Sequence, residues 1–136
     1  MNTFISGYEL ELFLRILLAA LAGWVIGLER ETLGKTAGTR TFALVSLGAA
    51  LFALTADGSG IQPVAAGIGF LGAGLIIFRG GHVEGLTTAA ALWAVAGLGL
   101  LFGLGRYGLG ILTTLLIILV LFLTRWIHPE AWKNHK

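Results

Sequence analysis

The chain has 136 residues, of which 57% are hydrophobic and only 12% are charged. Soluble domains carry roughly 25% charged residues, so this chain has too few charges to cover a surface that faces water. It contains no cysteine, which excludes disulfides and thiolate chemistry, and its net charge of +2 is too small to indicate binding to nucleic acid. The composition therefore predicts a single domain embedded in a lipid bilayer.

Five apolar segments follow one another along the chain. They cover about residues 10–28, 41–56, 63–78, 86–104 and 108–124. A helix that spans the bilayer needs roughly 17–25 residues, so the first, fourth and fifth segments are long enough, and the second and third must take in flanking residues. We predict an all-α integral membrane protein, a five-transmembrane-helix bundle. Residues 1–136 are expected to form one transmembrane domain, without a soluble C-terminal domain.

Lys and Arg residues are distributed unevenly between the two ends of these helices. Seven lie on the side of the first loop, the third loop and the C-terminal tail: Arg30, Lys35, Arg40, Arg79, Arg125, Lys133 and Lys136. The opposite side has Arg106 and, near the start of the first helix, Arg15. Because cytoplasmic loops are enriched in Lys and Arg, we expect the N-terminus outside and the C-terminus in the cytoplasm of a multi-pass membrane protein.

Small residues recur at helical spacing within the apolar segments, where they let membrane helices approach one another closely. The predicted helix-packing positions are Ala19, Gly23, Gly27, Gly67, Gly69, Gly72, Gly74, Gly99 and Gly103. The third segment has small residues on more than one face, so we expect it at the centre of the bundle. The fifth is rich in larger apolar residues and is expected at the periphery. Short, glycine-interrupted segments also mark transport sites, which leaves open a role for the third helix in ion binding.

The stretch GIGFLGAG, residues 67–74, begins with the letters of a dinucleotide-binding turn, G-x-G-x-x-G. That turn needs a preceding strand and a surrounding βαβ unit, whereas this stretch lies inside a continuous apolar run. We therefore interpret its glycines as helix-packing positions. Catalytic triads are not recognisable at any spacing, so we expect neither enzyme activity nor a bound cofactor.

Two ionisable residues are predicted near the outer surface. Arg15 lies inside the first helix, where a central charge costs about 2.5–3.5 kcal/mol on insertion scales. Its side chain can extend to the outer surface, or it can pair with Glu11, with another helix or with Asp57. Asp57 is also a weak candidate ligand for Mg²⁺, which proteins hold through one or two carboxylates and waters.

Charged residues also cluster at the predicted cytoplasmic ends of the helices: Glu29, Arg30, Arg40, Arg79 and Glu84. They are expected either to form a salt-bridged network that fixes two short loops or to form a partner-docking or anion-sensing surface. Thr87 and Thr88 follow Gly85-Leu86 at the start of the fourth apolar segment, and we expect their hydroxyl groups to cap the fourth helix.

Four motifs follow in order: Gly-x-Glu-Arg at residues 27–30, Ala-Gly-x-Arg-Thr at 37–41, GIGFLGAG at 67–74 and GLTTAA at 85–90. In this combination, over about residues 14–123, the chain resembles the membrane domain of the MgtC/SapB family. The resemblance implies a protein of the bacterial cytoplasmic membrane linked to magnesium homeostasis and virulence. It implies action by binding and modulating other membrane proteins, such as the F-type ATP synthase, with transport of an ion such as Mg²⁺ as the alternative.

The same resemblance carries over a set of characteristic polar positions without assigning their roles. These are Arg15, Glu29, Arg30, Arg40, Thr41, Asp57, Arg79, Thr87, Thr88 and Trp93. Five small helices would leave Gly and Ala surface uncovered, so we also expect a homo-oligomer.

Overall fold

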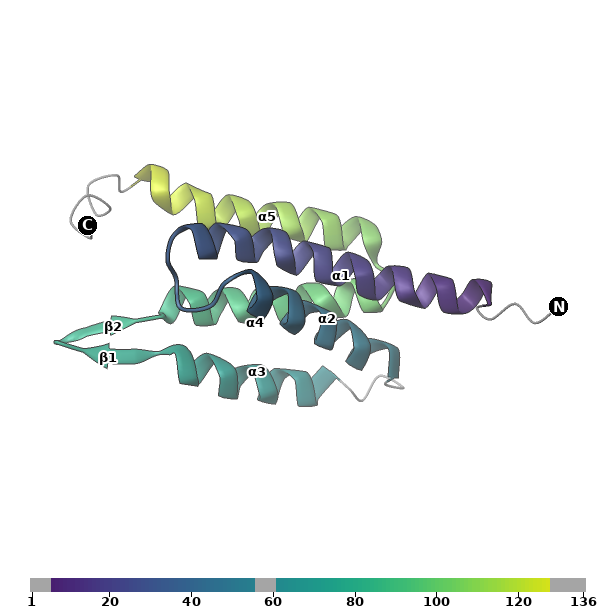
Figure 1. The fold of residues 1–136 in the computed structure, drawn as a ribbon, viewed down its shortest axis with the longest axis horizontal. Coiled ribbons are helices and arrows are strands. Elements are labelled where there is room, and N and C mark those ends of the chain that lie inside the picture. Colours follow the sequence, from purple (N-terminus) through teal and green to yellow (C-terminus); the bar gives the residue numbers. More distant parts are fainter. Residues whose placement is uncertain (1–5, 56–60, 128–136) are drawn as a thin grey trace.

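The computed structural model describes residues 6–55 and 61–127, with side chains up to residue 123. The elements, in chain order, are α1 (Gly7–Thr32), α2 (Thr39–Thr55), α3 (Ile61–Leu75), β1 (Ile77–Arg79), β2 (His82–Glu84), α4 (Leu86–Gly103) and α5 (Tyr107–Ile127). Consecutive helices run in alternating directions, so the α1–α2 loop and the hairpin lie at one end of the bundle. The start of α1 and the α4–α5 turn lie at the other end (Figure 1). The chain is thus mostly helical, as predicted.

Hydrogen bonds cap the start of α1 and the end of α4. At the start of α1, the Ser6 N–H donates to the Glu9 carboxylate (2.7 Å) while Ser6 Oγ accepts from the Glu9 N–H (3.2 Å), which is a capping box. Because this cap precedes the apolar run, α1 begins before the predicted residue 10. After α4, Gly105 adopts a φ of +73°, and the Arg106 N–H donates to the Leu101 carbonyl (2.9 Å) in a Schellman ending.

The prediction that the third helix continues to Phe78 was wrong. Helix α3 ends at Leu75, and β1 pairs antiparallel with β2 so that Phe78 lies opposite Val83. Gly80 and Gly81 connect the strands, both with positive φ, as a two-residue hairpin turn requires. A short apolar run does not distinguish a helix end from a strand, so the otherwise helical fold contains one hairpin that sequence periodicity missed.

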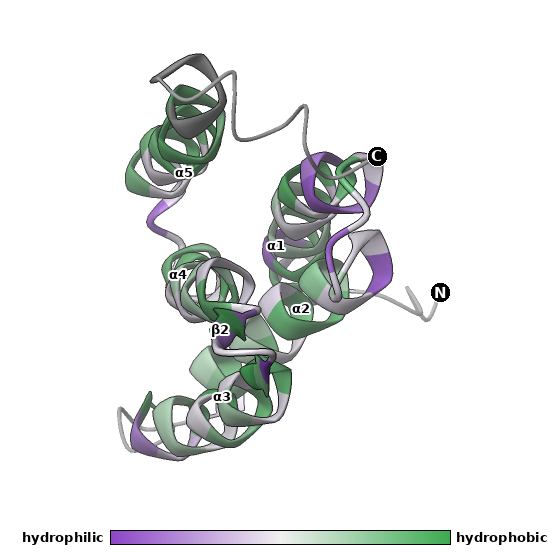
Figure 2. Cartoon of the chain, turned by 90° about the vertical axis from the view of Figure 1, so that its left-hand side faces the viewer, coloured by the Kyte–Doolittle hydropathy of each residue, from purple (hydrophilic) through white to green (hydrophobic). Residues whose placement is uncertain are grey.

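Helix α4 lies at the centre of the bundle, between α3 on one side, α5 on another and the α1–α2 pair (Figure 2). It buries ten residues, including Leu92, Val95, Leu98 and Phe102, whereas α3 buries three. The prediction that the third helix is central is therefore wrong. Helix α5 rests on α4 and exposes most of its large apolar side chains, in agreement with its expected peripheral position.

Large apolar side chains also cover much of the outer surface of the bundle. Examples are Phe13 on α1, Leu44 on α2, Phe70 on α3 and Leu112 on α5, which are 58%, 65%, 82% and 65% exposed. Within the described residues, α1 and α4 are each long and apolar enough to cross a membrane, and the other helices have shorter described apolar stretches.

Candidate functional site

Glycines bring α1 and α4 into direct contact with the buried face of α2. A Cβ at Gly23 of α1 would overlap the Phe42 carbonyl oxygen and lie 2.8 Å from Ser46 Cβ, and a Cβ at Gly27 would lie 2.6 Å from Thr39 Cα. Ala19, one turn before Gly23, is fully buried. The α1 positions predicted for helix packing thus bring the α1 backbone directly against α2.

Helix α4 also contacts this face of α2, further along the helix, and again through glycines. A Cβ at Gly99 would overlap the Ser46 carbonyl oxygen and lie 2.9 Å from Ala49 Cβ, and one at Gly103 would lie 2.7 Å from both the Ala50 carbonyl oxygen and Ala53 Cβ. Ser46 is fully buried where the three helices meet. One face of α2 therefore packs against glycines of both α1 and α4, where there is no room for side chains.

The glycines of GIGFLGAG are arranged differently. A Cβ at Gly67, Gly69 or Gly74 would meet nothing within 4 Å, and one at Gly72 would make an ordinary contact of 3.6 Å with Ala89 Cβ. Gly72 is therefore the position of this group that faces another helix of the same chain. The other three leave the α3 backbone uncovered, so they do not pack the bundle as predicted.

Arg15 reaches across the end of the bundle that holds the start of α1 and the α4–α5 turn. Its guanidinium forms an ion pair with Glu11, one turn earlier on α1, and donates from Nη1 to the Gly103 carbonyl oxygen at the C-terminus of α4 (3.2 Å). A Cβ at Gly105 would lie 3.0 Å from Arg15 Cζ, so the α4–α5 turn closes over the guanidinium. Of the predicted alternatives, the structure shows Arg15 paired with Glu11 and with another helix. Its third predicted partner, Asp57, lies outside the described residues, as does the weak magnesium site proposed there.

At the opposite end, Arg30 is buried and its Nη2 donates to Glu29 Oε1 (2.8 Å). Arg40, Arg79 and Glu84 are exposed, and across residues 6–55 and 61–123 they make no ion pair with each other or with Glu29 and Arg30. The predicted five-residue salt-bridged network therefore reduces, in the described part of the chain, to the Glu29–Arg30 pair.

Glu31 is a residue at this end that the sequence analysis missed. Its carboxylate accepts from the Thr39 N–H (2.8 Å) and from the Thr39 hydroxyl, so α1 provides the cap for the N-terminus of α2. Gly38 leaves room for this contact, because a Cβ there would lie 2.8 Å from Glu31 Oε2. An acidic residue just before a short loop that ends in Gly-Thr is the sequence signal that would have identified it.

The predicted cap of α4 is not formed by threonine. Gly85, with a φ of +83°, is the residue at the N-cap position, and no side chain caps the helix there. Thr87 and Thr88 lie inside the first turn of α4, where Thr88 is buried and Thr87 is exposed.

Trp93, on the same helix, is half exposed. Among the residues described, no three His, Asp or Glu side chains come together as a metal site would require.

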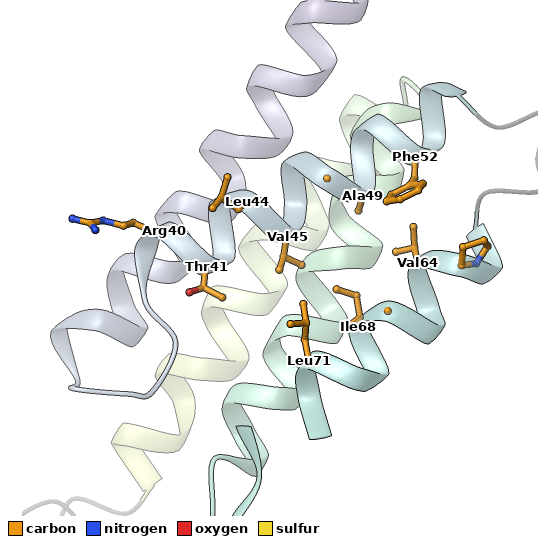
Figure 3. A pocket seen from close by; sticks show the side chains of 12 residues that line it. Arg40, Thr41, Leu44, Val45, Ala49, Phe52, Val64, Ile68 and Leu71 are labelled. Atoms are coloured by element: carbon orange, nitrogen blue, oxygen red, sulfur yellow. The ribbon is translucent and has the colours of Figure 1, made fainter. Parts of the chain in front are cut away.

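An open groove of about 530 Å³ separates α2 from α3 (Figure 3). Val45 and Ala49 of α2 face Val64 and Ile68 of α3 across it. Its lining residues are Arg40, Thr41, Leu44, Val45, Gly48, Ala49, Phe52, Pro63, Val64, Gly67, Ile68 and Leu71. Arg40 and Thr41, two of the predicted functional positions, thus lie at one end of an apolar groove.

A helical bundle with an apolar exterior, joined by direct backbone contacts at glycines, is consistent with an α-helical membrane protein. The chain belongs to the MgtC family, whose family model matches residues 16–129. The resemblance inferred from the four sequence motifs is therefore confirmed. No solved structure gives a significant match.

Relatives in several bacteria align with most of this chain. It is 42% identical to Protein SrpB of Synechococcus elongatus, over 93% of this chain and 82% of that protein. It is 41% identical to "Putative magnesium transporter YhiD" of Escherichia coli and 44% identical to Protein MgtC of Salmonella typhimurium, over 82% of this chain in both alignments. These alignments span 59% of YhiD and 52% of MgtC, so the chain corresponds to little more than half of those two proteins.

Proposed function

We propose that this protein is a non-enzymatic, multi-pass protein of the bacterial cytoplasmic membrane that binds another membrane protein and modulates its activity. The printed name of a relative, "Putative magnesium transporter YhiD", supports a role in magnesium-related physiology. The observation that carries the binding function is the uncovered backbone of α3, where Gly69 and Gly74 lie roughly 140° apart around the helix with the exposed Phe70 between them.

This surface has the properties of a helix-docking face. In a bilayer, helices associate where small residues let their backbones approach closely. Glycine also lowers helix stability by about 1 kcal/mol relative to alanine, yet the α3 glycines that line this surface gain no compensating contact within the chain. A transmembrane helix of a partner would supply that contact. Phe70, 82% exposed, would provide a large apolar anchor next to it.

Gly69→Leu is the direct test of this proposal. The new side chain would project into open space, so the bundle is expected to fold and the partner to be displaced. We expect photo-crosslinking from position 70 to capture a membrane protein with wild type and to lose about 90% or more of that product, roughly a tenfold weakening, with the variant. Rescue of growth at low magnesium in a strain lacking the chromosomal copy should fall in parallel.

Leu112→Ala on α5 is the matched control, because Leu112 is 65% exposed on a different helix. It should leave both crosslinking and growth unchanged. If Gly69→Leu kept the crosslink and full growth while its level in the membrane matched wild type, the α3 surface would not be the docking site.

Magnesium transport is the second candidate function, favoured by the printed name of the 41% identical relative YhiD. If this protein transports Mg²⁺, uptake into proteoliposomes should exceed that of empty vesicles, and Asp57→Asn should lower it by about tenfold through loss of a carboxylate ligand. Absence of uptake by protein whose helical circular dichroism spectrum is intact would rule this function out.

A further inference from the structure

The α2–α3 groove exists because α3 rests on α4 and makes little contact with α2. Its volume of about 530 Å³ lies within the range of roughly 300–1,000 Å³ that ligand sites have in proteins. Gly48 and Gly67 line opposite walls, and a Cβ at either position would meet nothing within 4 Å. The side chains of the chain therefore leave space that an apolar ligand can fill.

Among the described residues, the polar end of the groove is the one at Arg40. The described walls are formed mainly by aliphatic side chains, and Arg40 is the single charged residue among the described residues that line the groove. Arg40 is exposed at the N-terminal end of α2, and Figure 3 shows its side chain extending away from the apolar walls. The nearby Glu31 carboxylate is directed to Thr39 as a helix cap. A long apolar slot with a cation at one end is complementary to an amphiphile that has one anionic head group and a hydrocarbon tail.

We propose that the α2–α3 groove binds an anionic phospholipid, with an acyl chain between Val45 and Ile68 and its phosphate at Arg40. In the topology expected from the Lys and Arg distribution, Arg40 lies on the cytoplasmic side, so the lipid belongs to the inner leaflet. The Gly69 position that tests partner docking lies outside this site, because it is roughly 160° around α3 from the groove-lining Gly67. The ligand class follows from the shape of the groove and the position of Arg40.

Native mass spectrometry of the full chain in mild detergent tests this site with phosphatidylglycerol and phosphatidylcholine as probes. We expect wild type to retain a single phosphatidylglycerol. Gly67→Leu would place its side chain in the groove and should lower that retention by about tenfold, whereas Gly74→Leu, on the same helix outside the groove, should retain the lipid. Arg40→Gln should bind both lipids equally, because it removes the charge and leaves the apolar walls intact.

Gly48→Leu fills the groove from the α2 wall and gives a second, independent variant in case Gly67→Leu loses its helical circular dichroism spectrum. Equal phosphatidylglycerol retention by wild type and a folded groove-filling variant would overturn the proposal. So would disulfide crosslinks between two copies through cysteines placed at positions 48 and 67, because a second copy would then occupy the groove. Lipid retention does not depend on a protein partner. Absence of lipid binding can therefore be distinguished from absence of partner docking on α3.

Discussion

Gly99→Ala is expected to destabilise the bundle by about 1–3 kcal/mol, the usual cost of forcing an extra methyl group into a packed core. The added Cβ would overlap the Ser46 carbonyl oxygen and lie 2.9 Å from Ala49 Cβ. The Ser46 carbonyl is part of the α2 backbone and cannot move aside as a flexible side chain could, so α2 and α4 must separate. We expect the loss of stability to lie at the upper end of this range. It should be measured as a lower midpoint of thermal unfolding in detergent.

Gly97→Ala provides the control on the same helix. Gly97 lies two residues before Gly99 but faces open space, where a Cβ meets nothing within 4 Å. Alanine favours a helix over glycine by roughly 1 kcal/mol, so this variant should match or exceed the stability of wild type. Equal losses at both positions would mean that helix propensity, and not the α2–α4 contact, determines the effect.

Arg15→Met is expected to destabilise the protein by about 1.5–3 kcal/mol, the range for a hydrogen bond to a charged group. Methionine keeps an apolar stem of similar length but cannot donate to the Gly103 carbonyl. A cation near the last carbonyls of α4 also interacts favourably with the helix dipole, and this contribution is lost too. Thermal unfolding should show the change, together with faster proteolysis at the α4–α5 turn.

Two further variants separate the contributions to this contact. Glu11→Gln removes the ion pair on α1 but leaves the bond to Gly103, and because Glu11 is about half exposed it should cost only about 0.3–0.5 kcal/mol. Arg15→Lys keeps the charge without the forked guanidinium, so it should recover part of the loss. An Arg15→Met protein with wild-type stability would show that Arg15 serves no structural link between α1 and α4.

The surroundings of each glycine decide whether a leucine variant reports on the fold or on binding. A leucine at Gly23 would collide with the Phe42 carbonyl oxygen, so loss of activity there would reflect loss of the fold. A leucine at Gly69 meets open space, so loss of activity there would reflect loss of an external contact. Substitutions at the glycines that contact α2, namely Gly23, Gly27, Gly99 and Gly103, therefore test the fold, and substitution at Gly69 tests binding.

The sequence alone established the helical character of the chain and its family, and it predicted a membrane protein. The membrane prediction rests on composition and apolar length, because a chain with 12% charged residues has too little polar surface for water. The motifs from Gly27 to residue 90 were sufficient for the family. The positions of most helices followed from the same apolar runs, and only the hairpin after Leu75 was missed.

Which faces of those helices meet was decided only by the tertiary structure. A glycine lacks a side chain whether a neighbouring helix or empty space lies beside it. Gly99 and Gly69 therefore look equivalent in the sequence, although their surroundings differ in the fold. The partners of Arg15 and Glu31 were undetermined for a similar reason. Arg15 contacts a carbonyl at residue 103 and Glu31 caps the start of another helix, and only the packing of α1 against α2 and α4 brings those backbone groups within reach.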